Sequence, residues 1–213
     1  HVDSSAASDV YKRQDIDGSN LRCITESLDQ TPSTGFWGKN SSGVYFNVRE
    51  FGQSNVYHAD IKGKVKKITS GNHMLTMNDL VGSDAVATWT DPSNPSDIIS
   101  FSIDKPNKIN RLTDVNKDIF YNVEFGKVEE ITYKSVDEKY VQGWIVKPPN
   151  FDSNKKYPLV LRIHGGPHSM YHVGFNYNFQ LHAAQDQVVL YTNPRGSTGC
   201  LLYTSPSPRD GSI

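Results

Sequence analysis

The fold of this chain is decided by one stretch, Pro158-Leu-Val-Leu-Arg-Ile-His-Gly-Gly-Pro167. Residues 159–163 form a short, mostly apolar run with the length and β-branching of a buried strand. The chain then breaks at His164-Gly165-Gly166-Pro167, where two glycines free the backbone and a proline stops any continuing ladder. Unobstructed amides at the tip of such a strand can form half of an oxyanion hole. A plain tight turn has the same residues, so the neighbouring sequence must distinguish the two.

A helix and a second strand follow this stretch. Apolar residues recur at helical spacing and predict a helix over about residues 175–186; they are Phe175, Phe179 and Ala183. Val188-Val-Leu-Tyr191 predicts a second buried strand, which runs into Asn193-Pro-Arg-Gly-Ser-Thr-Gly199. Strand, loop, helix and strand make one βαβ unit, which favours parallel pairing of the two strands. Residues 128–135 and 140–146 predict an antiparallel hairpin ahead of this unit.

The chain up to about residue 122 contains a repeat. Leu21-Arg-Cys-Ile-Thr25, Val65-Lys-Lys-Ile-Thr69 and Ile109-Asn-Arg-Leu-Thr113 place their threonines 44 residues apart in both intervals (69 − 25 and 113 − 69). A period of about 40–45 residues is typical of a four-stranded propeller blade. Strand-like alternation lies between the markers, over residues 44–48, 57–61, 85–90 and 99–103. A generic antiparallel β domain with a chance repeat is the alternative.

Composition and charge argue against two classes of partner. The chain has 22 basic and 23 acidic side chains and a formal net charge of −1, which gives no general attraction to nucleic acid or to an anionic membrane. No apolar run approaches the ~18 residues of a membrane helix. The first residues lack the apolar core of a secretory signal. We therefore expect no nucleic-acid or membrane partner and a cytoplasmic location.

Both ends of the chain differ from its middle. Residues 1–14 and 200–213 have no clear period and resemble translated sequencing-adapter tails. Segments of this kind are left out of fold reasoning. We expect them to be non-native and to pack poorly, and we expect a native sequence from about Asp15 to Gly199 that is truncated on both sides.

The motifs together resemble one known family. The repeat, then Val141-Gln-Gly-Trp-Ile-Val-Lys-Pro-Pro149, then His-Gly-Gly-Pro-His168, then residues 193–199, is similar to the prolyl oligopeptidase family of serine peptidases. Its acylaminoacyl-peptidase branch is the most similar. The resemblance implies the C-terminal blades of a β-propeller (all-β) over residues 15–122. It further implies the N-terminal part of an α/β-hydrolase domain over residues 123–199. The implied reaction is hydrolysis of short peptides or acyl-amino-acid peptides through an acyl-enzyme, with a peptide substrate and no cofactor.

Few site residues carry over from the family. The backbone amide of Gly166 falls at the position of the family's oxyanion donor, and Gly165 would allow the loop to turn. Arg195 and Gly196 match the family's Arg-Gly turn, which we interpret as structural.

The catalytic triad is not expected within this chain. No Gly-x-Ser-x-Gly occurs in it, and α/β-hydrolases carry serine, acid and histidine in that order after the segments seen here. The three groups are therefore expected beyond Gly199. His164 precedes the nucleophile and is not expected to be the catalytic base.

A cluster of histidines suggests a metal site as an alternative, because imidazole is a common zinc ligand. The four histidines are His164, His168, His172 and His182. The first three straddle a Gly-Gly-Pro turn rather than one helical face, and no Cys, Asp or Glu lies among them before Asp186. We therefore expect no metal, and expect His168 to line a pocket mouth or to pack on Tyr171. In the repeat region, the isolated His58 and His73 are expected to be ordinary strand or loop residues.

Two other functions stay open. A lipase or esterase would have a third glycine in the first loop and no upstream repeat. A propeller interaction module would use its C-terminal region only as a scaffold. A Gly-x-Ser-x-Gly further along the protein would favour the hydrolases over the scaffold.

Overall fold

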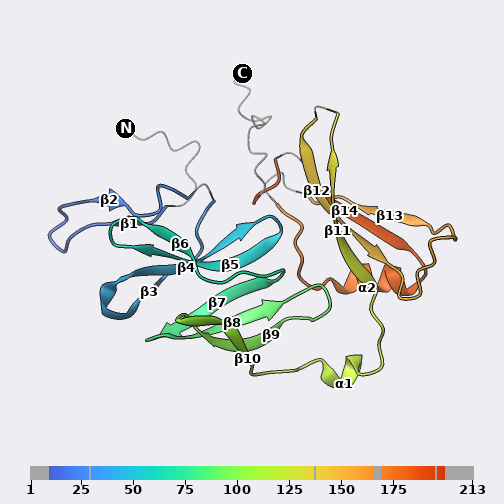
Figure 1. Cartoon of the computed structure of the whole chain (residues 1–213), viewed down its shortest axis with the longest axis horizontal. Coiled ribbons are helices and arrows are strands. Elements are labelled where there is room, and N and C mark those ends of the chain that lie inside the picture. Colours follow the sequence, from blue (N-terminus) through green and yellow to red (C-terminus); the bar gives the residue numbers. More distant parts are fainter. Residues whose placement is uncertain (1–9, 29, 137, 166–168, 195, 200–213) are drawn as a thin grey trace. The chain divides into compact units, whose positions relative to one another are not determined.

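A computed structural model describes residues 10–28, 30–136, 138–165, 169–194 and 196–199 (Figure 1). The chain divides into two units. The first holds the residues up to Thr90 together with Ser96–Asp114, and the second holds Asp91–Pro95 and the residues from Val115 onward. Each unit has its own sheet and is described by itself.

The first unit is built from strands. They are β1 (Lys12–Arg13), β2 (Arg22–Cys23), β3 (Phe36–Trp37), β4 (Gly43–Glu50), β5 (Gln53–Asp60), β6 (Val65–Lys67), β7 (Met74–Val81), β8 (Asp84–Thr90), β9 (Asp97–Ser102) and β10 (Lys105–Arg111), with a 3₁₀ turn η2 (Lys39–Ser41). β1 pairs with β2, and the others form an eight-stranded sheet in the order β10-β9-β8-β7-β5-β4-β3, with β6 on β5. The neighbouring pairs are antiparallel except β5 and β7, which meet in parallel where Ser54 lies opposite Met74.

The predicted fold class is wrong. We expected propeller blades followed by the start of an α/β domain. The regular secondary structure of the described residues is instead mostly strand, with two α-helices, and these residues form no closed propeller. The contact of Ser54 with Met74 joins strands of successive repeats into one sheet where separate blade sheets were expected. Alternation along a strand determines which side chains share a face. It does not determine how one group of strands joins the next.

The strands predicted inside the repeat are confirmed. β4 and β5 form one antiparallel pair, and β8 and β9 form another. Two apolar clusters pack between the strands. One comprises Ile24, Val44, Phe46, Val48, Tyr57 and Ala59, and the other comprises Val56, Leu75, Met77, Ala85, Ala87, Ile99 and Phe101. The β4–β5 hairpin contributes to both because its successive side chains point to opposite faces.

The repeated threonine makes the same contact three times. Its hydroxyl accepts a backbone N–H from an earlier strand or loop residue, and the residue before it donates its own N–H to that same earlier residue. The three hydroxyl bonds are Tyr11 N to Thr25 Oγ1 at 2.9 Å, Val56 N to Thr69 Oγ1 at 2.8 Å, and Ile98 N to Thr113 Oγ1 at 2.9 Å. The matching backbone bonds run from Ile24, Ile68 and Leu112, each at 2.8 Å. The repeat seen in the sequence therefore corresponds to a repeated structural contact.

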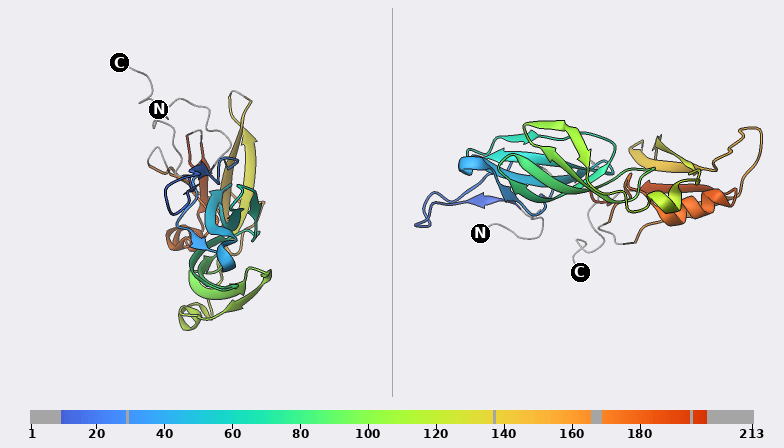
Figure 2. Two further views of the ribbon diagram at one scale, coloured as in Figure 1. Left: turned by 90° about the vertical axis from the view of Figure 1, so that its left-hand side faces the viewer. Right: turned by 90° about the horizontal axis from the view of Figure 1, so that it is seen from below.

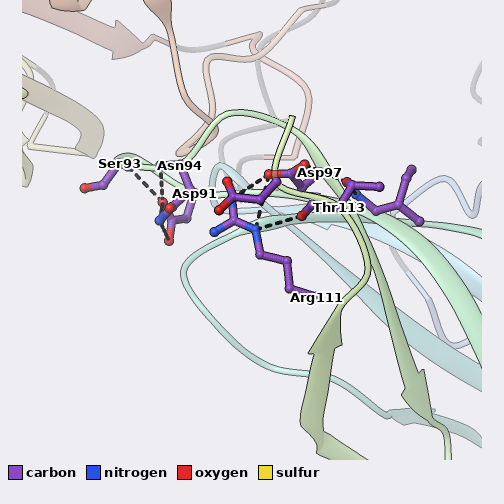
Figure 3. Close-up of polar contacts among 8 residues, drawn as sticks. Asp91, Ser93, Asn94, Asp97, Arg111 and Thr113 are labelled. Carbon is purple, nitrogen blue, oxygen red and sulfur yellow. Dashed lines mark hydrogen bonds and ion pairs between the residues drawn. The ribbon is translucent and has the colours of Figure 1, made fainter. Parts of the chain in front are cut away.

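The third of these contacts extends into an ion pair (Figure 3). Thr113 Oγ1 donates to Asp97 Oδ1 at 2.6 Å, and Arg111 Nη2 lies 2.5 Å from Asp97 Oδ2. Asp97 is buried, so its charge needs both partners. In the preceding repeat, Thr69 donates to the neutral Asn55 at 3.2 Å.

The second unit contains α1 (Lys117–Phe120), β11 (Lys127–Lys134), β12 (Tyr140–Lys147), β13 (Leu159–Arg162), α2 (Tyr177–Ala184) and β14 (Val188–Asn193). Its sheet has the order β11-β12-β14-β13. β11 and β12 form the predicted antiparallel hairpin, and β12 pairs antiparallel with β14. β13 and β14 are parallel neighbours with Leu159 opposite Val188, which confirms the predicted pairing.

Helix α2 packs against β14 and β12, and Figure 2 shows it beside this sheet. It begins two residues later than predicted, because Asn176 caps it by accepting the Phe179 N–H at 3.1 Å. Phe175 packs instead against the rings of Phe120 and Phe125. Among the described residues, no helix has the length and apolar character needed to span a bilayer.

Part of the predicted N-terminal tail is packed. The Tyr11 ring lies 5.5 Å from that of Phe46 and its hydroxyl donates to the Ser33 carbonyl. β1 pairs with β2 through Lys12 and Cys23. The expectation of poor packing is therefore wrong for Tyr11, while residues 1–9 and 200–213 lie outside the described residues.

Candidate active-site loops

The two sequence motifs follow the ends of neighbouring parallel strands. His164 comes just after β13, and Asn193 is the last residue of β14. Because β13 and β14 are parallel, their carboxyl ends meet at one edge of the sheet, the edge where α/β sheets bind ligands. The sequence therefore places both motifs at the edge of the sheet that is best suited to a site.

A histidine and a serine connect the two loops. His164 Nε2 lies 2.9 Å from Ser197 Oγ, and Ser197 Oγ donates to the Pro194 carbonyl at 2.6 Å. The distance alone would suit a nucleophile and its base. However, the serine is only 1% exposed and its hydrogen is already committed to a carbonyl. The other ring nitrogen lies 3.1 Å from the Gly165 carbonyl oxygen.

Two further contacts join the same loops. Asn193 Oδ1 accepts the Tyr171 N–H at 2.8 Å, and Asn193 Nδ2 donates to the Tyr171 carbonyl at 3.0 Å. Thr198 N donates to the Ser169 carbonyl at 2.9 Å. The loop after β13 is thus bonded to the loop after β14 on both sides of its central residues, and this explains why the two motifs occur together.

Among the described glycines of the two loops, those of the second loop have a left-handed backbone. Gly196 has φ +84° and Gly199 has φ +72°, in the left-handed region where side chains are strained. The Ser197 N–H donates to the Pro194 carbonyl at 3.1 Å and closes the turn. Gly165 has no left-handed φ, and nothing lies within 4 Å of where its Cβ would stand. Its expected role in turning the loop is therefore not supported by its backbone.

Several predicted residues lie outside the described part of the chain. Gly166 and His168 are among them, so the oxyanion donor and the packing of His168 remain predictions; Arg195 is another. The His164 ring packs on that of Tyr171 in a T-shaped arrangement, with the ring centroids 5.3 Å apart. Sequence reasoning missed this role of His164 and its bond to Ser197. The only signal was that a histidine opens one motif and a serine lies within the other.

Aromatic residues lie beneath the loops. Tyr171 packs against Tyr191 at 5.2 Å, and Tyr191 also meets Phe179 at 4.7 Å and Trp144 at 5.3 Å. Burial raises the pKa of Tyr191 well above its ordinary value, and the charge of Glu130 adds to this. Tyr191 therefore stays neutral and packs beneath the loops.

The histidines have separate partners. His172 Nδ1 accepts the Gly174 N–H at 3.1 Å, and His182 Nδ1 lies 2.7 Å from Gln187 Oε1. In the first unit, burial lowers the pKa of His58, whose ring lies 4.4 Å from Tyr45, and the His73 ring lies 6.4 Å from that of Trp89. Within the described ranges, no three His, Cys, Asp or Glu side chains are arranged to hold a metal ion.

Comparison with curated proteins shows peptidases. No protein-family model matches the chain. An uncharacterized peptidase of Bacillus subtilis, YuxL, is 32% identical over 204 residues, covering 87% of this chain and 30% of the relative. Dipeptidyl-peptidase 5 of Porphyromonas gingivalis is 29% identical over 166 residues, covering 76% of this chain and 24% of the relative. The chain therefore spans less than a third of the length of these relatives.

Comparison with solved structures shows that the fold of the chain is also similar to that of peptidases. An acylaminoacyl peptidase of Pyrococcus horikoshii is 27% identical with a TM-score of 0.70, covering 84% of this chain and 27% of that one. An acylaminoacyl peptidase in complex with Z-Gly-Gly-Phe-chloromethyl ketone is 27% identical with a TM-score of 0.72, covering 85% and 28%. Over most of its length the chain is therefore similar to peptidases, and this similarity supports its resemblance to the prolyl oligopeptidase family of serine peptidases.

Proposed function

We propose that the protein hydrolyses short peptides or acyl-amino-acid peptides through an acyl-enzyme. One observation carries this proposal: the two joined loops lie at the carboxyl ends of β13 and β14 in a chain similar to acylaminoacyl peptidases. Ligands commonly bind beyond the carboxyl ends of neighbouring parallel strands. The activity proposed is that of the complete protein, since the chain spans 30% of the first relative.

In this proposal the backbone N–H of Gly166 donates to the oxygen of the reacting carbonyl. That oxygen gains negative charge only as the tetrahedral intermediate forms, so a fixed donor stabilises the transition state more than the bound substrate. One such donor is typically worth about 3–4 kcal/mol. The described neighbours support this role because bonds hold the loop on both sides, at His164 and at Tyr171.

The covalent steps are assigned to residues beyond Gly199. A serine Oγ attacks the carbonyl carbon while a histidine takes its proton. The C–N bond then breaks, and the amine leaves with that proton. Water hydrolyses the resulting ester, which frees the acid and restores the serine. No group of the described loops has to exchange a proton, and the chemistry needs no cofactor.

A second candidate is the release of dipeptides. It is favoured by the similarity to dipeptidyl-peptidase 5 of Porphyromonas gingivalis. The two candidates differ in the end of the substrate that is recognised. An acyl-amino-acid substrate has a blocked amino group, whereas a dipeptide released from an unblocked chain carries a free and charged one.

The test uses the complete protein with three chromogenic substrates. They are an N-acetyl-aminoacyl p-nitroanilide, a dipeptidyl p-nitroanilide with a free amino group, and a p-nitrophenyl ester. We expect cleavage of the first and labelling by a serine-reactive fluorophosphonate. Cleavage of the second alone would favour the dipeptide candidate, and cleavage of the ester alone would favour an esterase. Absence of both labelling and cleavage would refute the proposal.

The cytoplasmic location expected from the sequence also stays a prediction. Fractionation of native cells, with detection by an antibody to this chain, tests it. Recovery in a membrane or secreted fraction would contradict it.

A further inference from the structure

We propose that His164 is a positioning residue that fixes the loop after β13 for the reaction through its hydrogen bond to Ser197. This rests on the proposed function, because positioning matters only if that loop presents an amide to the substrate. The bond joins the start of one loop to a buried residue of the other.

The bond has a defined direction. The Pro194 carbonyl can only accept, so the hydrogen of the Ser197 hydroxyl points to it across 2.6 Å. The serine oxygen is then left to accept. The Gly165 carbonyl, 3.1 Å from Nδ1, is also an acceptor only, so a neutral imidazole can donate to just one of the two oxygens. We assign the hydrogen to Nε2, which makes the shorter contact of 2.9 Å. Because Ser197 is 1% exposed, bulk water has little access to take the place of the imidazole.

The receiving side of the bond is held in place. Ser197 lies in a turn closed by its own N–H and shaped by the left-handed Gly196. The next residue, Thr198, donates to the Ser169 carbonyl. A hydrogen bond to a fixed acceptor limits the donor to a narrow range of positions, and the edge contact with Tyr171 limits the His164 ring further.

Within this chain, which spans 30% of the first relative, the sequence neighbours of His164 are exposed. Ile163 is 77% exposed, and Arg162 and Gly165 are exposed as well. At the far side of the loop, Tyr171 is bonded to Asn193. Releasing His164 would free one side of the loop and leave the other in place.

The first test replaces Ser197 in the complete protein. Ser197→Ala removes the acceptor, and we expect kcat to fall about 10- to 100-fold with KM nearly unchanged, because a misplaced oxyanion donor weakens only the transition state. Rates are normalised to active sites titrated with a fluorophosphonate, which removes the contribution of unfolded protein. The matched control is Ser153→Ala, the same chemical change at an exposed position between β12 and β13, which should keep the wild-type kcat.

The second test asks whether the two residues act as one unit. His164→Ala should lower kcat as much as Ser197→Ala, and the double variant should be no slower than either single one. His164→Gln keeps an N–H donor on a flexible side chain and should restore part of the rate. If Ser197→Ala does not fold, the His164→Ala and His164→Gln pair carries the test. Full wild-type kcat in both alanine variants would overturn the proposal.

A spectroscopic arm separates this inference from the proposed function. In the 213-residue chain, two-dimensional ¹⁵N–¹H NMR of the imidazole should show His164 protonated on Nε2, and Ser197→Ala should shift that signal. Absence of the bond would overturn the positioning role even in an active enzyme. If the bond is present but the complete protein neither cleaves peptides nor reacts with the fluorophosphonate, the proposed function fails, and the positioning role fails with it.

Discussion

The two units of this chain use buried polar side chains for different purposes. In the first unit Asn47, Ser54, Asn55 and Asp97 lie within strands. Asn47 Nδ2 donates to the Leu75 carbonyl at 2.6 Å, and its Oδ1 accepts the Met77 N–H at 2.8 Å. The amide side chain therefore bonds to the backbone of β7 as the peptide group of a neighbouring strand would. In the second unit Asn193 and Ser197 are equally buried but lie where strands end, and they bond loops.

This difference shows that burial of a polar residue does not by itself indicate its role. A buried polar group must find partners wherever it lies. When the partners are strands, the bond stabilises the sheet. When the partners are two loops at the ends of parallel strands, the bond shapes a surface that can hold a substrate. Substitutions should therefore affect stability in the first unit and activity in the second.

The largest expected effect is on the core of the first unit. Phe46 is fully buried between Tyr11 and Tyr57, and Phe46→Ala should lower the local free energy of unfolding by about 3–5 kcal/mol. Hydrogen exchange of the β4 and β5 amides measures this. The control is Phe51→Ala, at a 41% exposed position, which should stay within about 0.5 kcal/mol of wild type. Equal effects of the two changes would mean that this cluster is not a core.

The next effect concerns activity alone. Gly166→Pro removes the backbone N–H proposed to bind the oxyanion, and it should lower kcat of the complete protein by about 10²–10³. Gly166→Ala keeps that N–H and is the matched control, with a smaller loss expected. Steady-state rates normalised to labelled active sites provide the measurement. A proline variant as active as the alanine variant would remove Gly166 from the mechanism.

A smaller effect tests the repeated threonine. Thr69→Val keeps the shape of the side chain but leaves the Val56 N–H without its acceptor, so we expect about 1–3 kcal/mol of destabilisation. Thr132→Val makes the same change at an exposed position of β11 and should be nearly neutral. Urea unfolding of the two variants gives the comparison. A neutral Thr69→Val would show that the repeat has no energetic role.

The two smallest effects are on how the stability of the fold depends on pH. Burial alone would raise the pKa of Glu50, but hydrogen bonds from Lys67 and Tyr57 outweigh burial and hold the pKa below its ordinary value of 4.5. A carboxyl group with a lowered folded pKa stabilises the fold above its unfolded pKa, and this contribution disappears as pH falls through the folded pKa. The difference in stability between wild type and Glu50→Gln should therefore shrink below about pH 4.5. We expect it to stay under about 1 kcal/mol, because Lys67 is partly exposed.

Glu129→Gln gives the counterpart in the second unit. Hydrogen bonds from Lys147 and Lys127 lower the pKa of Glu129. Its side chain is 32% exposed, against 17% for Glu50. Solvent screening should therefore make its acid-dependent change the smaller of the two. Unfolding curves at several pH values test this order, and a larger change for Glu129→Gln would reverse it.

Local pattern predicted local structure well. Alternating residues predicted β4, β5, β8 and β9, and helical spacing predicted α2 to within a few residues of its ends. The βαβ order predicted the parallel pairing of β13 with β14. These features depend on side-chain direction and on short connections, and both can be read from neighbouring residues.

Long-range contacts were not predictable in the same way. The parallel contact of Ser54 with Met74, which overturned the blade arrangement, depends on how two hairpins meet. The packing of Tyr11 on Phe46 brings together residues that no local pattern connects. The bond from His164 to Ser197 spans 33 positions, and neither residue has a neighbour in the sequence that reveals its partner.

By itself, the sequence determined the strands, the threonine repeat, the two linked motifs and the family that they resemble. These follow from residue types and spacings, which act through local conformational preference and the period of each element. Only the tertiary structure decided that successive repeats share one sheet, that Asn193 and Ser197 bond the loop after β13, and that His164 faces Ser197. The reason is that a hydrogen bond depends on distance and direction in space, and the chain brings such partners together only after both strands have paired.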